Sequence, residues 1–418
     1  MKRTLFNTAL ALCLTGMVSA HADTPRGASI NPEFGRDLLV DVSAGLGSGA
    51  KQAGLSAETW RWNGVARIDS NDTPDVTANA AGSASKRVNA APNSERKNSQ
   101  SWIAVNMDTG FEYRVEMPRA FAHQIHRYAE MTGSNMGDPR FNNDVQQITE
   151  QLPQAKGWSN GVDTRTRRYD NTSFPFRAMG QMGGGETSGC SGTLIAHNIV
   201  LTAAHCVYSR SSEAFYSLAA TRFRPGREGE CNNASCEPYG EHNATWYFTP
   251  AEYRENANPW PYDYGIMVLS TSPGNQTGWL GYVAISDNAL EDFCADHLFG
   301  NGRCFNRGYP ACGLSGAPAS CEQGWAYQDV NNCEVGSFGS EAKDGWNSRV
   351  TVDCDMSGGH SGSALFTDIW ASNKKVVFGV ASTHVCTTCG PDDEFPNAYR
   401  RISPDVLDAI SYFKAAYP

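Results

Sequence analysis

The sequence has no cysteine between residues 23 and 189, although it has 13 cysteines in all. Cys13 lies near the N-terminus, and every other cysteine, an even number, lies between residues 190 and 389. An even set of this kind is typical of an oxidised domain outside the cytoplasm. The two parts of the chain are therefore stabilised in different ways, and we predict a first part at 23–168 and a second at 169–418.

The chain also lacks an excess of basic residues and a long apolar run. It has 44 acidic and 34 basic residues and a net charge of −10, which argues against a nucleic-acid partner. No apolar stretch reaches the roughly 20 residues that a transmembrane helix needs. A basic start, an apolar run and small residues near Ala20 and Ala22 predict a signal peptide over 1–22. We expect a secreted or periplasmic protein that leaves the membrane once this signal is removed.

Residues 23–168 combine a polar stretch with a short folded region. The stretch near 70–100 is rich in Ala, Asn, Ser and charge, which predicts a disordered linker. Two apolar runs, 102–107 and 111–117, bracket Asp-Thr-Gly, and the second alternates apolar and charged residues, which predicts a β-hairpin. The spacing of apolar residues near 119–131 predicts a helix. Together they predict a small α/β unit, either a removable pro-region or a permanent accessory domain.

A basic junction follows at residues 163–169, with the sequence Asp-Thr-Arg-Thr-Arg-Arg-Tyr. It fits an ordinary charged linker or a processing site. We favour processing, because exposed linkers are preferred sites of proteolytic cleavage. On this hypothesis, maturation removes the residues up to Arg165–Arg168.

The second part, 169–418, has short apolar runs and frequent Gly and Asn turns, which predict an all-β domain. Near its end, Val406, Ile410 and Phe413 recur at helical spacing. This pattern predicts a C-terminal helix over 404–413.

Ser361 lies in a glycine-rich stretch, Asp-Met-Ser-Gly-Gly-His-Ser-Gly-Ser. A serine hydroxyl needs a neighbouring base to become a nucleophile, and its reaction needs backbone N–H donors for the oxyanion. Gly358 and Gly359 allow a tight turn in which the amides of Gly359 and Ser361 point into one oxyanion hole. The sequence therefore predicts a catalytic serine in this turn.

Two upstream motifs supply the remaining catalytic groups. His205 lies in Leu-Thr-Ala-Ala-His-Cys, and Asp263 lies in Tyr-Asp-Tyr-Gly just before an apolar strand. The order His, Asp, Ser is that of the chymotrypsin-type triad. From about residue 165 to 418 the chain resembles a trypsin-like serine peptidase, and Ser-Gly-Gly-His-Ser-Gly-Ser is most similar to the bacterial glutamyl endopeptidase branch. Phe395 and the tail near 402–413 also resemble the end of that branch.

The resemblance implies two six-stranded Greek-key barrels with the active site in the cleft between them. The first barrel would supply His205 and Asp263, and the second Ser361. Ser361 would attack a peptide carbonyl, His205 would take its proton, and Asp263 would orient the imidazole. The resemblance also implies a disulfide between Cys190 and Cys206 that braces the histidine loop. It implies no cofactor and no metal.

Two further features concern the surroundings of the nucleophile. Animal trypsins carry an aspartate just before the serine, which pairs with the new N-terminal amine on activation; here that residue is His360, so this switch is absent. Cys354 lies near the nucleophile in sequence. A bridge from it to Cys386 or Cys389 would tie two walls of the substrate pocket.

Four residues are predicted to line that pocket: Asp355, Ser382, Thr383 and His384. Aligned on the nucleophile, Asp355 stands where trypsins carry the carboxylate at the base of the pocket, which would favour Arg or Lys before the cleaved bond. Ser382 and His384 would instead favour an acidic residue. We favour glutamate because of the resemblance around Ser361, with Arg or Lys as the alternative.

Three functions remain open at this point. The first is a monomeric secreted endopeptidase that acts on protein or peptide substrates. The second is a catalytically silent trypsin-like binding module, which an intact triad disfavours. The third is an esterase, which the absence of a strand–elbow–helix Gly-x-Ser-x-Gly context disfavours.

Overall fold

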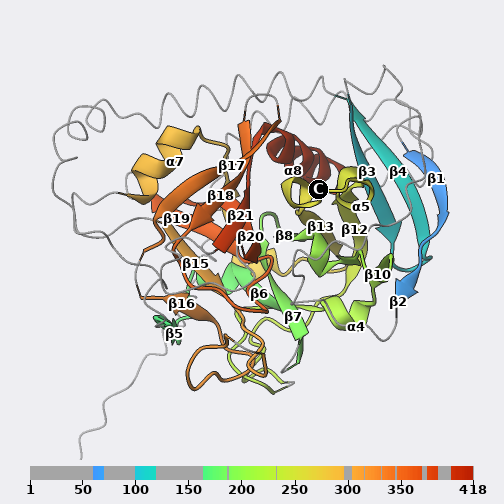
Figure 1. Ribbon diagram of the computed structural model, residues 1–418. Helices are drawn as coiled ribbons and strands as arrows, with labels where there is room; N and C mark the ends of the chain where they lie inside the picture. Colours follow the sequence, from blue (N-terminus) through green and yellow to red (C-terminus); the bar gives the residue numbers. More distant parts are fainter. Residues whose placement is uncertain are drawn as a thin grey trace, which may run out of the picture.

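The fold is built mainly from β-strands (Figure 1). The computed structural model describes residues 60–69, 99–118, 163–185, 188–231, 233–295, 304–314, 316–330, 332–343, 346–369, 374–384 and 397–417. The predicted all-β class is therefore confirmed. The predicted signal peptide, almost all of the linker near 70–100, and the helix near 119–131 lie outside the described residues.

The first large sheet has nine strands, and six of them come from residues 179–269. These six correspond to the first predicted barrel. In spatial order they are β12 (Ala244–Pro250), β13 (Gly265–Leu269), β8 (Ile199–Thr202), β7 (Ser188–Leu194), β6 (Met179–Gly185) and β11 (Phe223–Pro225). A small sheet beside it contains β2 (Ile68–Asp69), β10 (Ala214–Tyr216) and β9 (Tyr208–Ser209).

The other three strands of the first sheet come from the N-terminal part of the chain. They are β1 (Trp60–Val65), β4 (Phe111–Pro118) and β3 (Ser99–Asn106), and in Figure 1 they extend the sheet at one side. The predicted hairpin is thus confirmed as β3 and β4. Its assignment to a unit separate from the peptidase is not: β3 pairs antiparallel with β12, from Trp246 opposite Asn106 to Pro250 opposite Trp102.

Trp102 ties this hairpin to the core of the peptidase. Its ring is fully buried and lies edge-on to Tyr264, at 5.3 Å between ring centroids, and to Phe413, at 5.1 Å. The neighbouring Gln100 donates a hydrogen bond from its amide to the hydroxyl of Tyr264, at 2.7 Å. Because Tyr264 follows Asp263 directly, the hairpin supports the backbone beside the predicted catalytic aspartate.

We expect Trp102→Ala to lower the free energy of unfolding by about 3–5 kcal/mol, because a large buried ring leaves a cavity that the core fills only in part. Phe111→Ala on the same hairpin is the matched control, since Phe111 is 42% exposed and its loss is expected to cost less than about 1 kcal/mol. Urea unfolding of the full chain measures both. Equal and small losses would contradict the placement of the hairpin in the core.

The second large sheet also extends a set of six strands. The six, which correspond to the second predicted barrel, are β17 (Val335–Lys343), β18 (Trp346–Val352), β21 (Asn397–Arg401), β20 (Lys374–His384), β19 (Ala364–Ile369) and β15 (Cys304–Gly308). They continue into β16 (Tyr327–Asp329) and β5 (Arg165–Arg167), and β14 (Gly281–Tyr282) pairs with β20. The boundary predicted at residue 168 therefore does not separate β5 from the peptidase.

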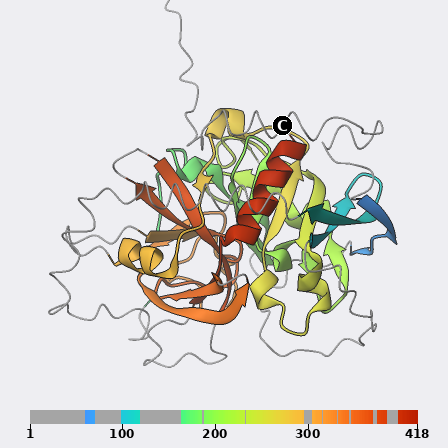
Figure 2. The ribbon, with the colours of Figure 1, turned by 90° about the horizontal axis from the view of Figure 1, so that it is seen from above.

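Among the residues that the structure describes, the helices are short apart from the last one. They are η4 (Phe176–Ala178), η5 (Ala204–Cys206), α4 (Leu218–Thr221), α5 (Ala251–Glu255), η6 (Trp260–Tyr262), α6 (Gly274–Thr277), α7 (Asp287–Cys294) and α8 (Pro404–Ala416). The predicted C-terminal helix is confirmed as α8, whose Val406, Ile410 and Phe413 are buried in the main core. Figure 2 shows α8 lying between the two groups of strands. Among the described residues, no helix is long and apolar enough to cross a membrane.

Candidate active site

His205 is held in place by a short helix and a disulfide. It lies in η5, directly after β8, and its side chain is almost completely buried. The next residue, Cys206, is joined to Cys190 of β7. The predicted disulfide is confirmed, and it fixes the histidine loop against the first sheet.

Asp263 accepts two hydrogen bonds from His205 that orient the histidine. It is fully buried at the end of η6, just before β13. One carboxylate oxygen accepts the backbone N–H of His205 at 3.0 Å, and the other accepts from Nδ1 of the imidazole at 2.8 Å. A carboxylate can only accept, so Nδ1 carries the proton and Nε2 is the basic nitrogen.

Ser382 completes this arrangement from the second sheet. Ser382 is predicted to line the substrate pocket, but its buried hydroxyl donates to Asp263 Oδ2 at 2.5 Å. The side chain therefore orients the aspartate from β20. Thr383, the next residue, is partly buried, and the side chain of His384 lies outside the described part of the chain.

The turn that carries Ser361, here called the nucleophile turn (residues 357–363), requires glycine at two positions. Gly359 has φ +95°, and a Cβ there would lie 2.4 Å from the carbonyl oxygen of Tyr309. Gly362 has φ +83°, and a Cβ there would lie 2.1 Å from the hydroxyl of Thr202 and 3.2 Å from the amide nitrogen of Ala203. The residue after Ser361 thus lies directly against the chain two residues before His205.

The two predicted oxyanion donors are the N–H groups of Gly359 and Ser361. Their directions follow from the carbonyl groups of the preceding residues, Gly358 and His360. Gly358 O accepts the N–H of Ala311 at 2.8 Å, and His360 O accepts the N–H of Ser363 at 2.8 Å. In a trans peptide the N–H points opposite to the C=O of the preceding residue. The amides of Gly359 and Ser361 therefore point away from these two internal donors.

Ser191 anchors the peptide between these two amides, a role that sequence reasoning missed. Its buried hydroxyl donates to Gly359 O at 2.8 Å and accepts the N–H of Tyr309 at 2.9 Å. Its own N–H donates to Ser361 O at 2.7 Å. The one feature of the sequence that marks Ser191 is its position next to Cys190 in Gly-Cys-Ser-Gly. A single serine can play many structural roles, so this position did not predict the contact.

Asp355 is buried beside Thr164, the residue that precedes β5. Its carboxylate accepts the backbone N–H of Thr164 at 2.8 Å, and its own N–H donates to Asp329 at 2.9 Å. Burial raises the pKa of Asp355 to about 7 despite the Thr164 hydrogen bond, and the charge of Asp329 acts in the same direction. One carboxylate oxygen, Oδ2, is therefore occupied by Thr164, and the other, Oδ1, is buried without a hydrogen-bond partner among the described residues.

Asp353 is a second buried carboxyl group close by. It accepts the N–H of Glu334 at 2.6 Å, and burial raises its pKa to about 8. In the unfolded chain an aspartate has a pKa of about 3.9. Between about pH 4 and pH 8 the folded state therefore keeps a proton on Asp353 that the unfolded state releases. The free energy of unfolding falls as the pH rises through this range.

We expect Tm to be at least about 5 °C lower at pH 8 than at pH 5, since each 1 kcal/mol shifts Tm by about 2–4 °C in a domain of this size. Asp353→Asn keeps an acceptor for Glu334 but cannot ionise, so its pH-dependent drop should be smaller. Thermal unfolding of both proteins across this range measures the difference. Identical pH profiles would contradict the assignment.

The disulfides correct one prediction. Cys354 pairs with Cys333, not with Cys386 or Cys389, so it joins the segment after β18 to the loop before β17. Cys386 and Cys389 lie outside the described residues. The other pairs are Cys231–Cys236, Cys294–Cys304 and Cys312–Cys321.

Cys190, His205 and Cys206 bring three potential metal-ligand atoms within 4.8 Å of one another. The two sulfurs are bonded to each other, and Nδ1 of His205 is hydrogen-bonded to Asp263. A metal binds the thiolate form of cysteine, which a disulfide does not provide. This set of residues therefore does not fit a metal centre.

Comparisons with known proteins relate this chain to trypsin-like sequences. Residues 163–294 match the family described as Trypsin. The chain is 29% identical over 255 residues to a glutamyl endopeptidase of Bacillus licheniformis. The aligned region covers 61% of this chain and 68% of that protein. The resemblance to trypsin-like serine peptidases is confirmed. Within that class, the similarity extends to the glutamyl endopeptidase branch.

Two further similarities are more limited. The chain is 39% identical over 127 residues to an extracellular metalloprotease of Bacillus subtilis, covering 29% of this chain and 38% of that protein, so it spans well under half of this relative. A solved structure of a Glu endopeptidase in complex with MPD covers 61% of this chain and 98% of that one. Its TM-score is 0.44 at 22% identity.

Proposed function

We propose that this protein is a secreted serine endopeptidase that cleaves peptide bonds through His205, Asp263 and Ser361. One observation carries the proposal: the buried carboxylate of Asp263 accepts from both the ring and the backbone of His205. The approach of Gly362 to Thr202 and Ala203, which brings the nucleophile turn against the histidine loop, supports it further.

The reaction follows from these groups. Ser361 Oγ attacks the peptide carbonyl while Nε2 of His205 takes its proton, and the amides of Gly359 and Ser361 stabilise the oxyanion. The imidazolium then gives the proton to the leaving amine, which departs and leaves an acyl-enzyme. Water attacks the acyl carbonyl with His205 again as base, and the acid product and Ser361 are released. Asp263 holds the imidazole and stabilises its cation, with Ser382 keeping the carboxylate in position.

Secretion is supported by the basic-apolar start of the sequence and by the five disulfides of the described residues. Disulfides persist in oxidising compartments outside the cytoplasm. A polypeptide substrate and a monomeric enzyme remain part of this proposal.

For the residue before the cleaved bond we propose an acidic side chain. Asp355, which would favour Arg or Lys, is 3% exposed and already accepts from Thr164. Burial of this carboxylate leaves little of it accessible to a cationic substrate side chain. The name of the Bacillus licheniformis relative, a glutamyl endopeptidase, supports the same preference.

Hydrolysis of matched peptides with Glu, Arg or Phe before the cleaved bond tests both function and preference, with casein and a short acyl ester alongside. We expect casein cleavage and a kcat/KM for the Glu peptide at least about tenfold above the others. This ratio corresponds to a difference of about 1.4 kcal/mol in transition-state free energy. Ester hydrolysis without casein cleavage would favour an esterase. A preference for Arg that vanishes in Asp355→Ala, but not in His384→Ala, would overturn the acidic preference.

A further inference from the structure

The segment predicted as an exposed processing junction is instead a strand beneath the nucleophile turn. Strand β5 pairs antiparallel with β16, with Arg165 opposite Asp329 and Arg167 opposite Tyr327. The two arginines differ sharply: the side chain of Arg165 is 2% exposed, whereas that of Arg167 is 26% exposed. A buried guanidinium is costly unless it is paired and hydrogen-bonded, so the contacts of Arg165 explain why it is there.

All three nitrogens of the Arg165 guanidinium donate hydrogen bonds. Nε and Nη2 donate to the two carboxylate oxygens of Asp163, at 2.9 and 2.7 Å, in a bidentate pair. Nη2 also donates to Gly316 O at 2.6 Å. Because the pair with Asp163 fixes the plane of the group, the direction of the remaining nitrogen, Nη1, is fixed as well.

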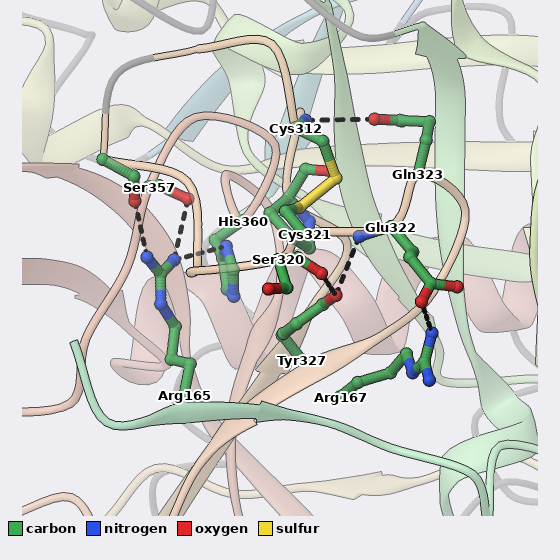
Figure 3. Close-up of a disulfide and its surroundings, with 12 residues drawn as sticks. Arg165, Arg167, Cys312, Ser320, Cys321, Glu322, Gln323, Tyr327, Ser357 and His360 are labelled. Carbon is green, nitrogen blue, oxygen red and sulfur yellow. Dashed lines mark hydrogen bonds and ion pairs between the residues drawn. A yellow bond between two sulfur atoms is a disulfide. The ribbon is translucent and has the colours of Figure 1, made fainter.

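Nη1 reaches the nucleophile turn. It donates to Ser357 Oγ at 2.7 Å and lies 3.5 Å from Nδ1 of His360, as Figure 3 shows. Ser357 and His360 are the two ends of one tight turn, since the N–H of His360 donates to Ser357 O at 3.0 Å. Between them lie Gly358 and Gly359. Arg165 therefore contacts both ends of the glycine pair that precedes the nucleophile.

This pair of glycines is the part of the turn that most needs support. Glycine has the greatest backbone freedom, and an oxyanion hole works only if its donors are already aimed at the developing charge. The guanidinium belongs to an intact strand, so this contact needs no amine released by cleavage. It is compatible with His360 at the position where animal trypsins carry an aspartate.

We propose that Arg165 is a positioning residue that holds the nucleophile turn in its catalytic geometry, and that the chain from Asp163 onward is a permanent part of the active enzyme. The proposal rests on the peptidase function proposed above. It argues against cleavage at Arg165–Arg168, because removal of Thr164 and Arg165 would leave Asp355 and Ser357 without their partners from this strand.

The test compares Arg165→Met with Arg167→Met in the full secreted chain. Arg167 lies two residues further on the same strand and pairs with Glu322, on the other side from the turn in Figure 3. After active-site titration to correct for unfolded protein, we expect Arg165→Met to lower kcat about 100-fold with KM changed less than about threefold, as loss of an oxyanion donor does. Affinity for a peptide boronate, which mimics the tetrahedral state, should fall with kcat. Arg167→Met should stay within about twofold of the wild type in kcat.

If Arg165→Met does not fold, Ser357→Ala decides, because it removes one acceptor of Nη1 and keeps the guanidinium. We expect it to lower kcat about tenfold with little change in KM. Peptide mapping of the active wild-type enzyme is a third readout, and it should recover Asp163, Thr164 and Arg165 as part of the active chain.

Equal kcat in Arg165→Met and Arg167→Met, an unchanged kcat in Ser357→Ala, or an active enzyme that begins after Arg165 would each overturn the inference alone, since the wild type would still be active. A folded wild type without peptidase activity would overturn the proposed function, and the inference with it.

Discussion

Ser361→Ala is expected to lower kcat by about a million-fold while leaving the fold intact, and His205→Ala is expected to do nearly the same. Ser361 supplies the nucleophile, so its loss removes the covalent route, and loss of His205 leaves the hydroxyl without the base that activates it. The hydroxyl of Ser361 is one small group on a partly buried residue, and the backbone contact from Ser191 N–H to Ser361 O survives the substitution. Steady-state hydrolysis of the preferred peptide, with thermal unfolding as the check on folding, measures both effects.

Ser363→Ala is the matched control for this prediction. Ser363 lies two residues further in the same turn, and its buried hydroxyl accepts from Asn306 Nδ2 at 2.7 Å. Its loss should cost about 1–3 kcal/mol of stability and leave most of the activity. Full activity in Ser361→Ala, or equal losses of activity in the two variants, would contradict the assignment of the nucleophile.

Asp263→Asn is expected to lower kcat about ten thousand-fold. The carboxylate accepts from His205 Nδ1, from His205 N–H and from Ser382 Oγ, all at 3.0 Å or less. An asparagine side chain has a single acceptor oxygen, so its NH₂ group must face one of these donors. If it faces the imidazole, the ring is held with its proton on Nε2, and that nitrogen can no longer take the proton of Ser361.

Ser382→Ala provides a graded comparison, because it removes one of the three donors and leaves the carboxylate in place. We expect a loss of about tenfold in kcat with KM nearly unchanged, the signature of a group that acts on the transition state. Both variants should keep the Cys190–Cys206 disulfide and a cooperative unfolding transition. Retention of more than about a tenth of the activity by Asp263→Asn would contradict a role for Asp263 in orienting the base.

Local patterns in the sequence predicted the elements well, and their packing less well. Alternation over 111–117 and helical spacing at Val406, Ile410 and Phe413 were sufficient for β4 and α8. The docking of the hairpin on β12 was not predictable in this way, because it depends on pairing between residues more than 100 positions apart. The absence of cysteine from the N-terminal part suggested a separate unit, whereas its strands share the core of the first sheet.

The site shows the same division. His205 and Asp263 were predicted from motifs and chain order, and the structure brings them together. The roles of Ser191, Ser382 and Arg165 were missed, because a single serine or arginine has no local pattern and its role is set by what the fold places beside it. The pairing of Cys354 with Cys333 was likewise not deducible, since spacing alone does not determine disulfide connectivity.

The central claim is that Ser361 is an activated nucleophile, and covalent labelling tests it most directly. The full-length secreted protein is treated with a fluorophosphonate probe, digested, and mapped by mass spectrometry, with Ser361→Ala and His205→Ala in parallel. We predict a single modification, on Ser361, that is absent from Ser361→Ala and far slower in His205→Ala. Labelling of a different serine, or none in correctly folded protein, would contradict the account.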